Sequence, residues 1–178
     1  MVEIERKFRL GTLPARQILG SGIRVDQGYL LIGEGELRVR RKGDRCYLTV
    51  KGEGGLERDE WDTPMPAWAF ILLWPQTEGR RIEKTRYAVP HDALTLEVDE
   101  YHGHLDGLFT MECEFPDRLV AERFVIPEWA SGAYEVTDDP AYKNKALAVH
   151  GLPNTPKRNE KRDSQSGGRA LKSGGSAT

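Results

Sequence analysis

The chain has 178 residues, of which 38% are hydrophobic, so it can form one compact domain with its own core. Its 26 Lys and Arg residues nearly balance its 28 Asp and Glu residues, and the formal net charge of -2 excludes a general electrostatic attraction to nucleic acid or acidic lipid. Strong electrostatic effects must therefore come from how the charges are arranged.

The sequence shows no signal for a membrane or an oxidising compartment. No apolar stretch approaches the roughly 20 residues of a membrane-spanning helix, and the N-terminus leads directly into a charged segment. The two cysteines, Cys46 and Cys113, lie in strand-like segments, and so sparse a pair is typical of reduced thiols. We expect a cytoplasmic protein that binds neither membrane nor nucleic acid.

The first strand shows a pattern that the later strands repeat. In an extended strand, alternate side chains share a face, so Glu3, Glu5 and Lys7 lie on one side and Ile4 and Phe8 on the other, largely apolar side. Two carboxylates about 7 Å apart on one face repel each other unless a metal, a ligand or opposing charges compensate them. The strand therefore predicts a compensating partner elsewhere in the chain.

Seven further segments have the same alternation and are separated by turns. They are residues 23–31, 36–41, 46–51, 57–62, 81–87, 94–101 and 108–115. Their charged faces carry pairs of like sign, namely Arg38 with Arg40, Lys84 with Arg86, Glu97 with Asp99 and Glu112 with Glu114. An ordinary sheet with one face in water also alternates, but such a face usually mixes uncharged polar residues with charges of both signs. The repeated like-charge pairs favour a binding site instead.

Three short helices and a terminal tail complete the expected domain. Segment 67–74 follows prolines and lacks alternation, which favours a short buried helix. Segments 118–124 and 141–149 are the other expected helices, and 133–137 is a short strand or extended link. Their arrangement predicts one domain over residues 1–152.

The composition changes to polar residues, Pro and Gly beyond residue 152. We expect residues 153–178 to form a disordered tail with local basic charge. We favour a solvated terminus for this tail over the alternative, a weak contact with nucleic acid or polyanions.

Closure of the strands would bring all charged faces together. We predict a mainly β protein of the α+β type, an eight-stranded antiparallel β-barrel tunnel with a few covering helices. Its apolar faces would point outward and need cover from segment 67–74, the last helix and a second subunit, which favours a homodimer.

The charges expected in the tunnel match a phosphate chain bound with divalent cations. The predicted substrate-binding residues are Arg38, Arg40, Lys51, Arg58, Lys84 and Arg86. The predicted ligands for Mg²⁺ or Mn²⁺ are Glu3, Glu5, Glu60, Asp62, Glu97, Asp99, Glu112 and Glu114. For Glu60 and Asp62, neutralising neighbouring arginines is an equal alternative.

The segment Glu3-Ile4-Glu5-Arg6-Lys7 resembles the E-x-E-x-K signature of the CYTH superfamily, the triphosphate tunnel metalloenzymes. The resemblance continues in order through 27–30, 37–40, 48–51, 78–87, 112–115, 135–137 and 142–147, and covers about residues 1–152. It implies an eight-stranded antiparallel tunnel and is greatest for the small bacterial inorganic triphosphatases. The tail departs from that pattern.

The resemblance and the charge pattern together imply hydrolysis of inorganic tripolyphosphate to diphosphate and phosphate. Glu3, Lys7 and Lys84 are the predicted catalytic residues, with Glu3 as base or second-metal ligand and a lysine orienting the terminal phosphate. A class IV-type adenylate cyclase, or a thiamine or nucleoside triphosphatase using the same tunnel, is the alternative. A non-catalytic polyphosphate-binding module is the third possibility.

Overall fold

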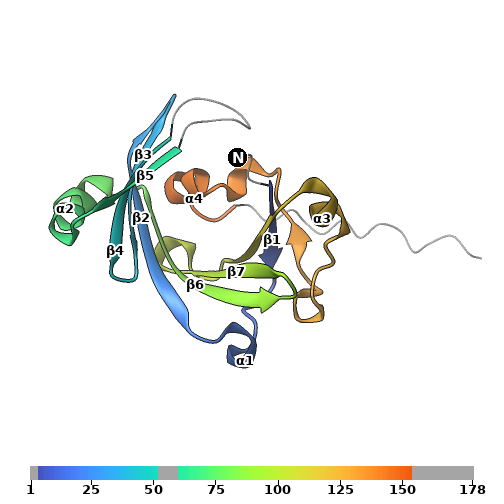
Figure 1. The fold of residues 1–178 in the computed structure, drawn as a ribbon. Helices are drawn as coiled ribbons and strands as arrows, with labels where there is room; N and C mark the ends of the chain where they lie inside the picture. Colours follow the sequence, from blue (N-terminus) through green and yellow to red (C-terminus); the bar gives the residue numbers. More distant parts are fainter. Residues whose placement is uncertain (1–3, 52–59, 154–178) are drawn as a thin grey trace, which may run out of the picture.

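The computed structural model describes residues 4–51 and 60–153, and its strands form one antiparallel sheet (Figure 1). The strands are β1 (Ile4–Leu10), β2 (Gly22–Ile32), β3 (Glu36–Lys42), β4 (Arg45–Lys51), β5 (Glu60–Met65), β6 (Arg81–His91), β7 (Leu94–Tyr101), β8 (Phe109–Phe115) and β9 (Tyr134–Glu135). Their order across the sheet is β5-β4-β3-β2-β6-β7-β8-β1-β9. The predicted mainly β fold class is therefore confirmed.

The sheet curves strongly, so that β3, β4 and β5 face β1 across a hollow (Figure 1). Among the described residues, β5 and β9 are the two ends of the sheet order and do not pair with each other. The structure therefore has a ninth strand, the two-residue β9, in addition to the eight predicted strands. In place of the expected closed tunnel, the described residues form a curved sheet with a concave face.

β5 differs from its predicted range. It extends to Met65, and its last residues pair with β4, where Pro64 lies opposite Tyr47. Proline cannot donate a backbone hydrogen bond, but a strand at the end of a sheet has no partner on one side and tolerates it. The predicted start of this strand, residues 57–59, lies outside the described residues.

The helices are short. They are α1 (Arg16–Leu19), α2 (Ala67–Leu73), α3 (Arg118–Arg123) and α4 (Asn144–His150), with 3-10 turns at Trp74–Thr77, Gly103–Leu105, Glu128–Ala130 and Pro140–Tyr142. The helix predicted over 141–149 is divided, because Lys143 has extended backbone angles between the last turn and α4. Within the described residues, no helix has the length and apolar character needed to cross a bilayer.

The outer face of the sheet holds the main core. Phe8, Leu96, Val98 and Met111 from β1, β7 and β8 are fully buried and pack with residues from α1 and α3. α2 covers a smaller cluster on β3 and β4 that includes Val39. The apolar faces of these strands therefore point outward and are covered by the helices, as predicted for α2.

The last helix packs where the sequence did not predict it. Leu147 of α4 is fully buried against Tyr29, Ile82 and Tyr101, which lie on the concave side of the sheet. Each lies two residues from a polar residue on the same face of β2, β6 or β7, so the concave face becomes apolar at one end. Because that end needs cover, α4 occupies the hollow and does not cover the outer face.

Replacing Leu147 by Ala tests this packing. The cavity left behind should lower the free energy of unfolding by about 2–5 kcal/mol, measured by urea denaturation. Val149→Ala, at a side chain of the same helix that is 44% exposed, is the control and should cost much less. Equal losses in both variants would contradict the packing of α4 into the hollow.

Candidate active site

The concave face holds three cavities that share lining residues. Two inner cavities of about 250 Å³ and 320 Å³ both include Glu5, Arg38, Lys51, Glu112 and Asn144. An outer cavity of about 800 Å³ also includes Glu5 and Glu112. The hollow of the sheet is therefore a lined space with charged walls from several strands.

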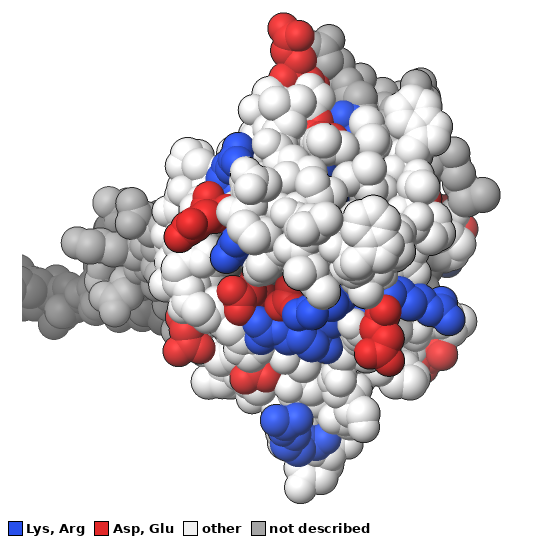
Figure 2. All heavy atoms as spheres, turned by 90° about the vertical axis from the view of Figure 1, so that its left-hand side faces the viewer, with Lys and Arg blue, Asp and Glu red and all other residues white. Residues whose placement is uncertain are grey.

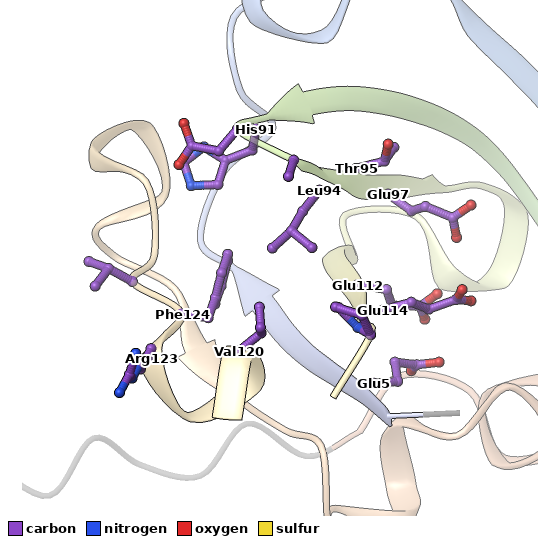
Figure 3. Close-up of a pocket in the computed structure, with 14 residues that line it drawn as sticks. Glu5, His91, Leu94, Thr95, Glu97, Glu112, Glu114, Val120, Arg123 and Phe124 are labelled. Atoms are coloured by element: carbon purple, nitrogen blue, oxygen red, sulfur yellow. The ribbon is translucent and has the colours of Figure 1, made fainter. Parts of the chain in front are cut away.

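Carboxylates gather where the inner and outer cavities meet. The strand register places Glu5 of β1 opposite Glu114 of β8, and Glu112 of β8 opposite Glu97 of β7. Their side chains face a common space (Figure 3). Like charges directly opposite one another destabilise a sheet, so this end of the site favours binding of a cation.

Arg86 of β6 connects the acidic and basic sides. Its Nε and Nη2 donate to the two oxygens of Asp99 at 2.7 and 2.6 Å, and Nη2 also donates to Glu112 Oε2 at 2.7 Å. Its Nη1 donates to Glu97. Because charge-assisted, two-point contacts fix the planar guanidinium, Arg86 is held in one orientation.

Two lysines complete the network. Lys7 Nζ lies 2.6 Å from Glu112 Oε1, and Lys84 Nζ donates to Asp99 Oδ2 at 2.5 Å. Asp99 is fully buried, and an unpaired charge there would be very costly. Asp99 and Glu112 are therefore engaged by cations from the neighbouring strands.

The pKa values separate the carboxylates by role. Burial alone would raise the pKa of Glu112, but Lys7, Lys84 and Arg86 outweigh it and hold that pKa far below its ordinary value. Burial alone would likewise lower the pKa of Lys7, yet electrostatic interactions with Tyr101 and Glu112 raise it. Both groups stay charged near neutral pH.

Glu5 behaves differently. Its side chain lies in the hollow but reaches solvent. Its pKa is raised to about 7, mainly by burial and secondly by repulsion from Glu112. Lys7 opposes this shift without cancelling it. Glu5 thus carries uncompensated negative charge that a bound cation would neutralise.

The basic side of the site comes mainly from three strands. Arg38 and Arg40 of β3, Lys51 of β4, and Lys84 and Arg86 of β6 line the 320 Å³ cavity. Several guanidinium and ammonium groups together suit phosphate oxygens.

Asp62 of β5 orients Arg40. Arg40 Nη2 donates to Asp62 Oδ2 at 2.6 Å, and the Thr49 hydroxyl also donates to Asp62. The Nε of Arg40 is buried, and it has no hydrogen-bond partner among the described residues. Asp62 therefore contacts an arginine, which is what the alternative to metal binding predicts for this residue.

The described part of the structure brings most predicted site residues together on or beneath the concave face. These are Glu5, Lys7, Arg38, Arg40, Lys51, Asp62, Lys84, Arg86, Glu97, Asp99, Glu112 and Glu114. Glu60 begins β5 opposite Lys51. Glu3 and Arg58 lie outside the described residues.

The described part of the chain does not contain a preformed metal site. Within residues 4–51 and 60–153, no three Asp, Glu, His or Cys side chains lie close enough to hold an ion. The donors nevertheless fit a hard divalent cation, because Glu5, Glu97 and Glu114 supply only oxygen atoms and share one space (Figure 3).

The charge pattern missed several residues that line the inner cavities. Gln27 and Tyr29 of β2 carry no charge, and Gln27 Nε2 donates to the Tyr29 hydroxyl at 3.0 Å. Lys145 of α4 forms an ion pair with Glu36 of β3 at 2.9 Å, beside Asn144. Only the motif resemblance included these residues, through segment 27–30 for β2 and segment 142–147 for α4.

Comparison with known proteins agrees with this geometry. The profile of the CYTH domain family matches residues 1–117. An inorganic triphosphatase of Nitrosomonas europaea is 44% identical over 153 residues, which cover 84% of this chain and 98% of that protein. An inorganic triphosphatase of Acetivibrio thermocellus is 37% identical over 155 residues, covering 85% and 96%.

A solved structure shows the same relationship. The crystal structure of an inorganic triphosphatase covers 86% of this chain and 98% of its own, with 38% sequence identity and a TM-score of 0.69. Both the matched family profile and the extent of these alignments include the strands that form the site. The chain therefore belongs to the CYTH domain family.

Proposed function

We propose that this protein hydrolyses inorganic tripolyphosphate to diphosphate and phosphate. One observation carries the proposal: basic side chains from β3, β4 and β6 face a group of carboxylates across one cavity. The names of the two relatives as inorganic triphosphatases support it. A linear triphosphate would be held by the cations, while a divalent cation would lie on the carboxylates.

Substrate binding in this proposal depends on fixed cations. Lys84 and Arg86 both contact Asp99, so their charges are oriented before substrate binds. Arg38, Arg40 and Lys51 line the facing wall, and Arg58 is assigned with them from the sequence pattern. Preorganised cations stabilise the charge that develops on phosphoryl oxygens in the transition state.

The carboxylates would hold Mg²⁺ or Mn²⁺. Glu5 and Glu114 are the best-placed ligands, with Glu97 and Glu112 beside them. When bound, the ion would neutralise phosphate charge and lower the pKa of the attacking water. Glu3 is proposed as base or second-metal ligand, and Lys7 or Lys84 as the group that orients the terminal phosphate.

A triphosphate with an organic group is the second candidate substrate. The 800 Å³ outer cavity combines carboxylates with apolar side chains that include Leu94, Val120 and Phe124, and half-apolar pockets of this size accept organic groups. This observation makes a nucleoside or thiamine triphosphatase the second candidate, after the inorganic triphosphatase. We also propose that residues 1–152 form one domain and that residues 153–178 form a tail. We further propose that the protein is cytoplasmic.

The function is tested by measuring phosphate release from tripolyphosphate, ATP and thiamine triphosphate with Mg²⁺, Mn²⁺ or a chelator. We expect fastest turnover on tripolyphosphate, no turnover with chelator, and at least about tenfold lower activity for Glu114→Gln. Fastest turnover on ATP with cyclic AMP as the product would overturn the proposal. Full activity of Glu114→Gln would overturn the metal assignment.

The raised pKa of Glu5 predicts how metal binding depends on pH. Its pKa of about 7 in the metal-free protein exceeds the ordinary 4.5, so its contribution to folding stability is complete below about 4.5 and is lost as the pH rises through about 7. A divalent cation binds the carboxylate form and reverses that loss. The rise in melting temperature caused by Mg²⁺ or Mn²⁺ should therefore be larger at pH 8 than at pH 6.

Two variants test this pH effect, one at Glu5 itself and one as a control. Glu5→Gln should give a smaller metal-induced rise that changes little between the two pH values. Glu122→Gln, at an exposed position on α3, should behave as the unmodified protein. Glu112 does not contribute in this range, because its cationic partners keep it ionised. An unchanged rise in Glu5→Gln would argue against Glu5 as a ligand.

We also propose that two copies associate through α2. Trp68, Ile71 and Leu72 are 65%, 64% and 66% exposed, and much of the surface on this side is uncharged, next to a band with charges of both signs (Figure 2). An apolar patch beside mixed charges suits a self-complementary interface.

Light scattering tests this association. The protein should have twice the monomer mass, and Ile71→Glu should give the monomer while retaining the fold. Val149→Glu, on the exposed side of α4, is the control and should remain dimeric. A monomer at all concentrations would refute the interface.

A further inference from the structure

We propose that Thr137 is a positioning residue for the reaction. Its hydroxyl group holds the backbone of Lys7, so that the Lys7 ammonium lies beside Glu112, in place to orient a phosphate. This inference rests on the proposed function and adds to it a residue that the charged faces of the strands do not include. Thr137 acts through Lys7 and is not assigned a contact with the substrate.

The backbone of Lys7 is bonded to the segment that follows β9. The Lys7 N–H donates to Thr137 Oγ1 at 3.0 Å, and the Val136 N–H donates to the Lys7 carbonyl at 2.8 Å. Both backbone groups of Lys7 therefore point away from β8, where Glu112 lies opposite Lys7. Antiparallel strands bring side chains closest at such positions, and Lys7 Nζ lies 2.6 Å from Glu112 Oε1. The contacts that hold the backbone of Lys7 thus also set the place of its ammonium.

Thr137 supplies an acceptor where strand pairing ends. β9 has two residues and lies beside β1 at the end of the sheet (Figure 1). The chain then turns, and the Asp139 N–H donates to the Val136 carbonyl at 3.1 Å. The side-chain oxygen of Thr137 therefore accepts the bond that a backbone carbonyl accepts in a regular strand pair. Loss of this oxygen would remove the acceptor of the Lys7 N–H, and an unsatisfied donor is unfavourable.

The hydroxyl of Thr137 is itself oriented by an ion pair. It donates to Glu135 Oε1 at 2.7 Å, and Arg6 Nε and Nη2 donate to the two oxygens of Glu135 at 2.9 and 2.7 Å. Arg6 Nη1 also donates to the carbonyl of Ala121 in α3 at 2.9 Å. Because the hydroxyl hydrogen is directed to Glu135, the lone pairs of the oxygen remain to accept from Lys7.

The position of Lys7 matters because its side chain is enclosed by the site. Lys7 is buried, and it lines the 250 Å³ cavity together with Thr137 and Glu112. A displacement of about 1 Å at a group that orients a substrate can lower a rate about 100-fold. Arg38 and Lys51 line the same cavity and would still hold the phosphate chain. Loss of the Thr137 hydroxyl should therefore affect kcat more than KM.

The first experiment removes the hydroxyl and then restores it. Thr137→Val should lower kcat for tripolyphosphate about tenfold or more, with KM changed less than about threefold. Thr137→Ser keeps the oxygen and should retain most of the activity. Thr85→Val is the matched control, because Thr85 Oγ1 bonds His102 Nε2 at 2.8 Å on the face of β6 opposite to Lys84 and Arg86. It should lower the melting temperature without lowering kcat.

The second experiment measures the position of Lys7 without turnover. Limited acetylation with acetic anhydride, quantified by mass spectrometry, reports how accessible each lysine is. Lys7 should react slowly in the unmodified protein, several times faster relative to Lys145 in Thr137→Val, and slowly again in Thr137→Ser. Lys145 is the internal reference, because its side chain is 40% exposed.

The outcomes separate this inference from the proposed function. Full kcat in Thr137→Val overturns the inference, and so does an equal loss of kcat in Thr137→Val and Thr85→Val or a failure of Thr137→Ser to retain activity. If the unmodified protein hydrolyses no triphosphate, the proposed function fails and the reactivity of Lys7 decides the inference. An unchanged reactivity of Lys7 in Thr137→Val then overturns it.

Discussion

The contacts of Arg86 with Asp99 and Glu112 are the interaction on which the rest of the site depends. Arg86 is largely buried among three strands that supply both signs of charge, and without its carboxylate partners that burial would be strongly unfavourable. The same contacts take up the negative charge of Asp99 and Glu112. They therefore decide which carboxylates remain to attract a metal and which cations are oriented toward a phosphate chain.

The strand register explains why the carboxylates are not equivalent. Lys7 lies opposite Glu112, whereas Glu5 lies opposite Glu114. One carboxylate thus has a cation as its cross-strand neighbour, and the other has a second carboxylate. The cations around Glu112, Lys7 first among them, lower its pKa, whereas burial and then repulsion from Glu112 and Glu114 raise the pKa of Glu5 to about 7. Two glutamates on neighbouring strands thus acquire different chemistry from the residues around them.

Alternation in the sequence was sufficient to predict the strands and the shared face of Arg86, Glu97 and Glu112, because side-chain direction in a strand follows the two-residue period. It could not predict which charges pair, since pairing depends on register between strands distant in sequence. It also missed the position of α4, since an apolar helix face fits either side of a sheet. Pro64 in β5 was missed because only an end strand tolerates it.

The fold thus joins two unlike surfaces at the site. The strands supply fixed charges, and α4 packs into the hollow through Leu147. The central claim is that cations on β3, β4 and β6 hold a triphosphate while Glu5 and Glu114 hold its metal. The most direct measurement is a crystal structure with Mn²⁺ and a non-hydrolysable triphosphate. The account predicts anomalous Mn²⁺ density at Glu5 and Glu114 and phosphates beside Arg40, Lys84 and Arg86, whereas phosphates bound outside the concave face would contradict it.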